Sequence, residues 1–266
     1  MSARRLVQFL GLFGAVQCAS SPAWRILLDL VVKLSGVKRS DQVTVSGVPT
    51  SGTFADKNVG LLKPVTTDLS GAVLSGLDAG NYTLTGLVQP LTAKITPAKL
   101  VATATAQSKI YDGTSLGAIT LGDNRIAGDV LSVAYAAANF NNKKAGLNKT
   151  VSVTGITVTD ADAGNYVLKS ATISTKADIA KASLTEVAFA QNKVYDGKTA
   201  DIVTFTDNRI AGDVFAVRYK AAFADALVGT GKLVSVSGIR LSGADAGNYA
   251  LTSTTDTATA DITPRP

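Results

Sequence analysis

One five-residue motif, Asp-Ala-Gly-Asn-Tyr, occurs three times and sets the period of this chain. Its copies occupy residues 78–82, 162–166 and 245–249. The motif glycines are Gly80, Gly164 and Gly247, which gives a nearly constant period of about 84 positions. This period is longer than that of a small solenoid repeat and is close to the size of one β domain. The spacing predicts a tandem array of β domains.

Each motif has the surroundings of a tyrosine corner. An alternating apolar and polar run, such as residues 150–158, precedes the motif, and a leucine follows two positions after the Tyr, at Leu84, Leu168 and Leu251. This spacing is typical of the entry into strand F of an immunoglobulin-like sandwich, where the Tyr ring covers the core and its hydroxyl bonds to the backbone. Antibody domains have a bridging Cys where this chain has Leu. We therefore predict an all-β fold of tandem immunoglobulin-like β-sandwich repeats, each as long as the motif period and without a disulfide.

Composition and turn signals agree with short strands. Thr, Val, Ala, Ser and Gly dominate, and only 17% of residues are charged, which is typical of a β protein. The two Asp-Gly pairs are strong turn signals because Gly adopts positive φ without cost. In the second copy we expect strands at 100–106, 109–111, 118–121, 130–135, 151–158, 165–168 and 171–179.

Recurring landmarks suggest that the first copy is incomplete. In the two later copies, Tyr-Asp-Gly begins at Tyr111 and Tyr195, and an Asp follows each at the same distance, at Asp129 and Asp213. Asp41 is the corresponding Asp of the first copy, so its Tyr-Asp-Gly should begin at position 23, where Ala-Trp-Arg stands. We therefore expect a partial β repeat at 41–97 and complete repeats at 98–181 and 182–266. The open edge of the first copy should be exposed or covered by residues 26–34, and this copy should be the first part to unfold.

Residues 1–40 have two interpretations. Two arginines, the apolar run 6–16 and small residues up to Ser20 follow the layout of a secretory signal, with cleavage after Ser20. Alternatively, the segment is a foreign start joined to a truncated array. The apolar stretch 24–34 is too short and too charged to span a bilayer, and its Asp29/Lys33 spacing suits a short amphipathic helix.

Net charge does not indicate nucleic-acid binding. The chain carries a net charge of +6, of which +5 lies in residues 1–40 and +1 in the rest. A nucleic-acid surface would place the basic excess on the folded repeats, with aromatic side chains beside it. We therefore expect no nucleic-acid partner and no stable membrane insertion of the repeats.

The residues for catalysis or metal binding are scarce. The chain has no His and one Cys, which removes the commonest general base and any thiolate cluster. Without His it cannot form a Ser-His-Asp triad, and it lacks a phosphate-binding glycine loop before a helix, while a carboxylate pair for glycoside hydrolysis stays open because Asp is plentiful. We assign no catalytic, cofactor-binding or metal residue and expect no cofactor. The aromatic residues Tyr135, Tyr219, Phe140 and Phe223 are expected in the core.

A calcium loop is the one metal site that the letters suggest. Asp160 and Asp162 place carboxylates on alternate residues before a Gly, but only this copy has the first Asp, and the bidentate Glu is missing. The recurring acids, Asp78, Asp162 and Asp245, are better explained as acceptors for backbone N–H groups in a corner turn. That role predicts that calcium changes the melting temperature of the repeats little.

Together these motifs resemble the YDG-type repeat of large secreted bacterial adhesins of the filamentous-haemagglutinin kind. Tyr-Asp-Gly, the segment 54–60 (Phe-Ala-Asp-Lys-Asn-Val-Gly) and Asp-Ala-Gly-Asn-Tyr carry the resemblance, over about residues 34–266. The resemblance implies a structural or adhesive segment, secreted or at the bacterial cell surface, acting as a stalk or spacer without catalysis. The alternative is a module that itself recognises a host glycan or protein, and an enzyme is the third possibility.

Overall fold

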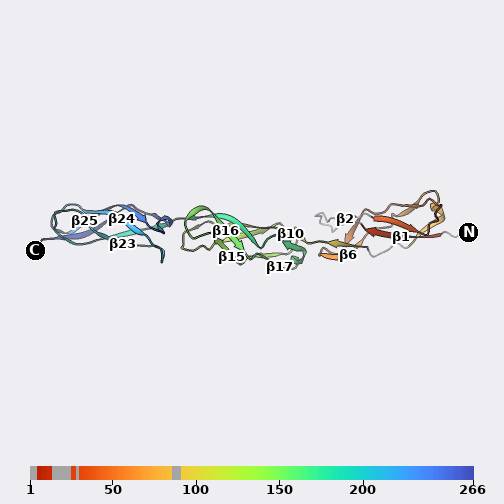
Figure 1. The fold of residues 1–266 in the computed structure, drawn as a ribbon, viewed down its shortest axis with the longest axis horizontal. Helices are drawn as coiled ribbons and strands as arrows, with labels where there is room; N and C mark the ends of the chain where they lie inside the picture. Colours follow the sequence, from red (N-terminus) through yellow and green to blue (C-terminus); the bar gives the residue numbers. More distant parts are fainter. Residues whose placement is uncertain (1–4, 14–24, 28–29, 86–90) are drawn as a thin grey trace. The chain divides into compact units, whose positions relative to one another are not determined.

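The computed structural model describes residues 5–13, 25–27, 30–85 and 91–266. Their regular structure consists of β-strands and three single-turn 3₁₀ helices, so the all-β prediction is confirmed (Figure 1). Within these residues, no helix has the length and hydropathy needed to cross a bilayer. We call strands β1–β9 the first repeat, β10–β19 the second and β20–β27 the third.

The third repeat shows the architecture most completely. A four-stranded sheet has the order β22-β27-β25-β24, and two-stranded sheets are formed by β21 with β23 and by β20 with β26. Both β20·β26 and β22·β27 are parallel, whereas the other pairs are antiparallel. The strands are β20 (Ala182–Leu184), β21 (Glu186–Ala190), β22 (Lys193–Val194), β23 (Val203–Asp207), β24 (Ala216–Phe223), β25 (Gly229–Ser242), β26 (Tyr249–Leu251) and β27 (Thr255–Thr263), with η3 (Ala246–Asn248) before β26.

The core of this repeat lies between its sheets. Alternate residues of β25 are buried, and Phe223, Val234, Val236 and Ile262 form a cluster with Ala188 of β21. Alternation arises because successive side chains of a strand point to opposite faces. The period-two pattern in the sequence therefore decides which face of each strand is covered.

The second repeat has the same plan. Its four-stranded sheet has the order β12-β19-β16-β15, with pairs β11·β13, β10·β18 and β14·β17. The bounds are β10 (Ala98–Leu100), β11 (Ala102–Ala106), β12 (Lys109–Ile110), β13 (Ile119–Asp123), β14 (Ser132–Ala134), β15 (Ala137–Phe140), β16 (Gly146–Thr154), β17 (Thr157–Thr159), η2 (Ala163–Asn165), β18 (Tyr166–Leu168) and β19 (Thr172–Ala180). Strands occupy every stretch expected in this copy, but 100–106 is divided between β10 and β11, and 151–158 between β16 and β17.

The first repeat is more complete than the sequence suggests. In it, β1 pairs in parallel with β8, joining Arg5 to Tyr82, as Ala98 joins Tyr166 and Ala182 joins Tyr249. The remaining pairs follow the orders β3-β1-β8, β2-β5-β6-β9 and β4-β7. The bounds are β1 (Arg5–Phe13), β2 (Arg25–Leu27), β3 (Leu30–Ser35), β4 (Thr44–Ser46), β5 (Ser51–Phe54), β6 (Gly60–Thr66), β7 (Val73–Ser75), η1 (Ala79–Asn81), β8 (Tyr82–Thr85) and β9 (Leu91–Ile95).

Two expectations for residues 1–40 are therefore wrong. The helix over 24–34 is replaced by β2 and β3, because pairing of β3 with β1 outweighs the weak helical spacing. The first repeat also begins before residue 41, since β1 pairs with β3 and β8. Position 23, where its Tyr-Asp-Gly was expected, lies outside the described residues. The candidate cleavage site after Ser20 lies outside the described residues.

Contacts divide the chain into two compact units. The first holds residues 1–101, 124–132 and 158–169, and the second holds residues 102–123, 133–157 and 170–266. The second repeat contributes to both units. The contacts between the first and second repeats described below lie in the first unit, and those between the second and third repeats lie in the second.

Candidate functional site

The three motif tyrosines close a loop in each repeat. Their hydroxyls donate to a carboxylate about forty positions upstream and accept a backbone N–H from the same loop. Tyr249 donates to Asp213 over 2.6 Å and accepts the Ile210 N–H at 2.9 Å. The equivalent sets are Tyr82 with Asp41 and Lys38, and Tyr166 with Asp129 and Ile126.

The backbone bond of the predicted tyrosine corner is therefore confirmed, and Tyr82 and Tyr249 are buried. The carboxylate partner was not predicted. Its signal in the sequence is the Asp that recurs at a fixed distance after each Tyr-Asp-Gly.

The recurring acids of the motif accept backbone N–H groups, as predicted. Asp78, Asp162 and Asp245 accept the N–H groups of Gln42, Val130 and Val214 at 2.8–2.9 Å. Each bond ties the 3₁₀ turn to the same upstream loop that the tyrosine holds. In the second and third repeats, the two side chains together fix the loop that receives the preceding repeat.

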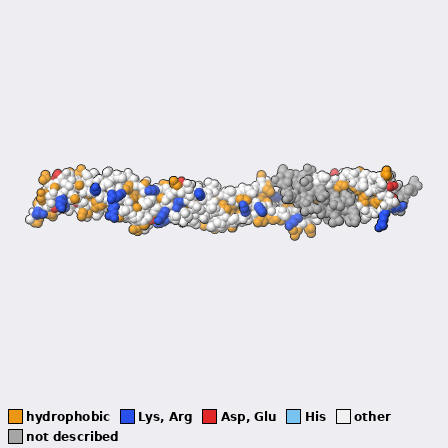
Figure 2. Space-filling model, turned by 45° about the horizontal axis from the view of Figure 1, so that its top comes forward, with side chains coloured by type: hydrophobic (Ala, Val, Ile, Leu, Met, Phe, Trp, Pro, Cys, Tyr) orange, Lys and Arg blue, Asp and Glu red, His pale blue; other side chains and the backbone are white. Residues whose placement is uncertain are grey.

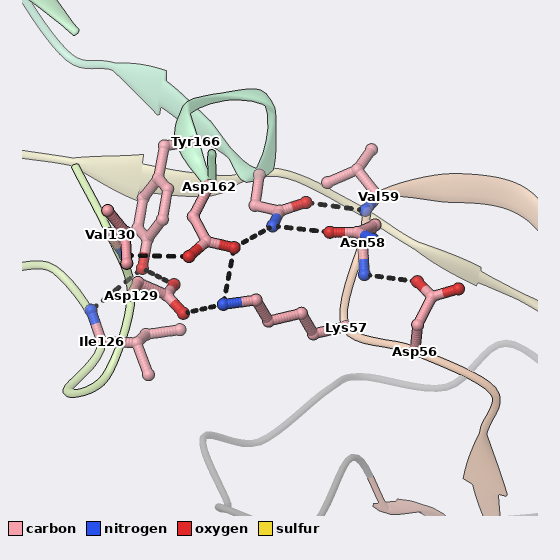
Figure 3. A network of polar contacts seen from close by, with 10 residues as sticks. Asp56, Lys57, Asn58, Val59, Ile126, Asp129, Val130, Asp162 and Tyr166 are labelled. Carbon is pink, nitrogen blue, oxygen red and sulfur yellow. Dashed lines mark hydrogen bonds and ion pairs between the residues drawn. The ribbon is translucent and has the colours of Figure 1, made fainter. Parts of the chain in front are cut away.

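A loop of the first repeat docks on this closed loop of the second. Lys57, three positions after β5, pairs with Asp129 at 2.7 Å and with Asp162 at 2.5 Å. Figure 3 shows its ammonium group between the two carboxylates. Beside it, the Asn165 side chain accepts the Val59 N–H at 2.9 Å and donates to Asn58 at 3.2 Å.

These contacts shift the pKa values of Lys57 and Asp162. Hydrogen bonding to Asp129, then to Asp162, raises the pKa of Lys57, and hydrogen bonding to Lys57 lowers the pKa of Asp162. Burial, with Asp129 beside it, raises the pKa of Tyr166. The cluster is therefore a lysine held between two carboxylates, and the raised pKa of Tyr166 keeps its hydroxyl neutral at physiological pH.

The second repeat docks on the third through equivalent positions. Lys143 pairs with Asp213 at 3.0 Å, and the Ala145 N–H donates to the Asn248 side chain at 3.0 Å. The Tyr111 hydroxyl also donates to Asp213, at 2.8 and 3.0 Å, so this carboxylate receives two tyrosines and one lysine. The tyrosine of Tyr-Asp-Gly thus bonds to the following repeat.

The other two letters of Tyr-Asp-Gly shape the same contact. Asp112 accepts the Thr114 N–H at 2.9 Å and pairs with Lys109 at 2.8 Å, which closes the turn. Gly113 has φ of +76°, and a Cβ there would lie 3.0 Å from a methyl group of Ile210. Glycine therefore meets two requirements, the left-handed backbone and the close approach of the next repeat.

Asp213 is the most enclosed acid of this junction, with 6% of the residue exposed. Burial would raise the pKa of Asp213, but hydrogen bonds from Tyr249, Tyr111 and Lys143 together lower it. Burial raises the pKa of Tyr249 to about 12. A buried charge is tolerated here because three donors replace its water.

The remaining candidates from the sequence fall elsewhere. Asp160 accepts the Ser132 hydroxyl, whereas Asp162 is engaged by Val130 and Lys57. Among the described residues, no group of three or more His, Cys, Asp or Glu side chains is placed to hold a metal ion.

The expectation of core positions holds for three of the four named aromatic residues. Phe140 and Phe223 are buried, and Tyr219 packs against the core of the third repeat. Tyr135 is exposed, so its assignment to the core is wrong. It lies between β14 and β15, outside the strands whose inward faces form the core.

Comparison with known families agrees with the repeat plan. The YDG domain model matches three stretches, at residues 27–93, 96–174 and 178–258. The chain belongs to the YDG domain family. The first match begins at residue 27, so part of the segment that we had set apart as residues 1–40 belongs to the first YDG domain. None of the curated proteins matches the chain.

Proposed function

We propose that this YDG chain is a structural and adhesive segment of a secreted or surface-exposed bacterial adhesin, and that it acts as a spacer. The observation that carries the proposal is the use of one docking scheme at two successive junctions. At each junction a lysine and a backbone N–H of one repeat bind an aspartate and an asparagine of the next. Such contacts restrict motion between neighbouring domains, which a spacer requires.

Strand polarity gives the proposal a second support. The opening strand β20 pairs in parallel with β26, and β22 pairs in parallel with the last strand, β27. The Tyr195 N–H extends the second pair by donating to the Thr263 carbonyl at 2.9 Å. A pull on the two ends of the repeat slides parallel strands past each other, so several hydrogen bonds must break together. Such a repeat resists tension better than one that unzips.

The test is single-molecule force spectroscopy on the whole chain held at its two ends. A spacer should give separate force peaks as its repeats unfold. Lys143→Ala should lower the force at which the second and third repeats yield, because Asp213 loses its cation. Lys144→Ala is the matched control, since this neighbouring lysine is exposed and its side chain forms no ion pair within the described part of the chain. A chain that extends without force peaks would refute the spacer role.

One observation favours the alternative, a module that binds a host glycan or protein directly. On the outer face of β21 and β23, the third repeat exposes Val187, Phe189 and Ile202, and Phe189 is 51% exposed. The second repeat has Thr103, Thr105 and Ala118 at the equivalent positions. Exposed aromatic and aliphatic groups of this kind often mark interaction sites. A cell-adhesion assay comparing the chain with Phe189→Thr decides, since loss of adhesion would favour direct binding.

A further inference from the structure

Glu186 lies at the base of the loop of the third repeat on which the second repeat docks. Its strand β21 pairs with β23, and in that pair Glu186 stands opposite Asp207, the last residue of β23. Both oxygens of the Glu186 carboxyl group are buried and have no hydrogen-bond partner within the described part of the chain. The receiving loop, residues 207–215, begins at that strand end and carries Asp213, which binds Lys143 of the second repeat. An acid without a partner therefore adjoins the anchor of the receiving loop.

Arg209 holds the receiving loop closed. Its guanidinium binds Asp207 at 2.5–3.1 Å and donates to the Phe215 carbonyl at 3.1 Å. It also lies over the Phe215 ring, with its central carbon 3.8 Å from the ring centroid. One cation thus joins the end of β23 to the residue that precedes β24. Between these two ends, Asp213 accepts the hydroxyl of Tyr249 and the contacts of the second repeat.

The charges around Glu186 balance while it is neutral. Asp207 and Arg209 act on it from β23 and from the receiving loop. On β27, which packs against β21, Asp256 already accepts a backbone N–H of β21 at 2.8 Å. Tyr249 of β26 acts on Arg209 and stays neutral, because burial raises its pKa to about 12. If Glu186 ionises, its carboxylate faces that of Asp207 and competes with it for Arg209.

The second repeat has the same loop without this acid. There Ala102 faces Asp123 across the β11·β13 pair. Arg125 donates to the Leu131 carbonyl at 2.5 Å, as its counterpart does in the third repeat. Closure of the loop therefore does not require an acid at the position of Glu186, so the third repeat carries an additional titratable group there.

We propose that Glu186 is a proton-controlled latch on the receiving loop of the third repeat. While the acid is neutral, Arg209 clamps the loop, and the second repeat stays docked on Asp213. When the acid ionises, it repels Asp207 and draws on Arg209, so the loop opens more often and the docking weakens. This role concerns one junction and does not rest on the proposed function as a spacer.

The latch should open as the pH rises through neutrality. Burial, and then repulsion by Asp207, raise the pKa of Glu186 from 4.5 to about 7 while the loop is closed. In an open loop, water reaches the carboxylate and its pKa falls back toward the ordinary value, so loss of the proton favours the open form. The chain has no His, the side chain that most often titrates in this range.

Amide hydrogen exchange of the whole chain, followed residue by residue by NMR at pH 5.5 and pH 8, tests the latch. Glu186→Gln keeps the shape of the neutral acid, so the two chains should nearly agree at pH 5.5. At pH 8 the amides of residues 208–215 should exchange about tenfold faster in the wild type, the factor for one unit of pKa difference between the closed and open loop. The Ala145 N–H, which binds Asn248 across the junction, should exchange faster too. Comparison at equal pH cancels the intrinsic rise of exchange with pH.

Two controls separate the latch from a general effect of charge. Asp201→Asn removes another acid of the third repeat that has a buried oxygen without a partner among the described residues. Asp201 lies beyond the opposite end of β23 from Asp207, so this variant should keep the pH dependence of the wild type. The equivalent loop of the second repeat, residues 124–131, should exchange equally in the wild type and in Glu186→Gln.

Three results would overturn the proposal. The first is equal exchange of residues 208–215 in the wild type and in Glu186→Gln at pH 8. The second is exchange of these residues no faster than that of β25, because the loop would then open only when the whole repeat unfolds. The third is an equal effect of Asp201→Asn, which would assign the pH dependence to net charge. Circular dichroism of each variant checks that the β fold is retained.

Discussion

At the residue scale, Glu186 is the side chain that departs most from the pattern of the repeats. Both its carboxylate oxygens are buried without a hydrogen-bond partner among the described residues, and its strand neighbour across the β21·β23 pair is Asp207. Burial, and then repulsion by Asp207, raise its pKa to about 7, against a smaller opposing effect of Arg209. The guanidinium is already committed to Asp207, at 2.5–3.1 Å. The second repeat has Ala102 at this position.

Glu186→Ala should therefore stabilise the chain, and more at pH 8 than at pH 5. The pKa of Glu186 in the folded state lies above its ordinary value of 4.5, so folding favours the neutral acid. The cost of ionising it appears as the pH rises above about 4.5, grows until about pH 7 and then stays constant. We expect a gain on the order of 1 kcal/mol at pH 8, after allowance for solvent near the carboxylate. Thermal unfolding followed by circular dichroism at the two pH values measures it, and an equal gain at both would contradict it.

Individual residues also show which contacts could be predicted from the sequence and which could not. The role of Asp162 as a backbone acceptor follows from a local turn, so it was predictable. The bond from Tyr166 to Asp129 was not, because the two residues lie 37 positions apart and only the fold brings them together. Likewise, the Lys57 contacts with Asp129 and Asp162 join two repeats. A period marks which residues recur but does not say which of them meet.

At the element scale, the N-terminal strands were the part of the fold that could not be predicted from the sequence. Short apolar runs fit a strand, a helix or the core of a signal equally well, and neither β1 nor β3 shows strict alternation. Strand pairing decides that these runs are strands. The pair β1·β3 corresponds to β11·β13 of the second repeat, and the pair β1·β8 corresponds to β10·β18. In the later repeats, strong alternation and Asp-Gly turns made the strands predictable.

Removing residues 1–13 should destabilise the first repeat alone. The deletion takes away β1, so β3 and β8 each lose a neighbouring strand and expose unpaired backbone groups. Limited proteolysis of the shortened chain should cut between residues 30 and 95 well before it cuts the second or third repeat. The full-length chain is the control and should resist longer in that region. Equal resistance of the two chains would show that β1 does not contribute to the stability of the repeat.

At the scale of the whole molecule, the repeats form a series in which the receiving loops of the second and third are completed by the repeat before them. Stability in such an array is approximately a sum over repeats plus a contribution from each junction. The junctions here are polar, with Lys57 on two carboxylates at one and Lys143 with two tyrosines on Asp213 at the other. On the face seen in Figure 2, other Lys and Arg side chains are scattered rather than gathered in one patch.

Lysine side chains already pair with the aspartates at both junctions, so we predict that calcium does not stabilise the chain. Asp162 would have to give up Lys57 and the Val130 N–H to bind a metal ion, and Asp160 already accepts the Ser132 hydroxyl. Only a ligand that prefers the native state raises the melting temperature. Melting the whole chain in millimolar calcium and again with chelator should therefore give midpoints within about one degree, whereas roughly 1 kcal/mol of binding would shift the midpoint by several degrees. A calcium-dependent rise that Asp160→Asn abolishes would mean that the ion displaces Lys57 and takes over the junction.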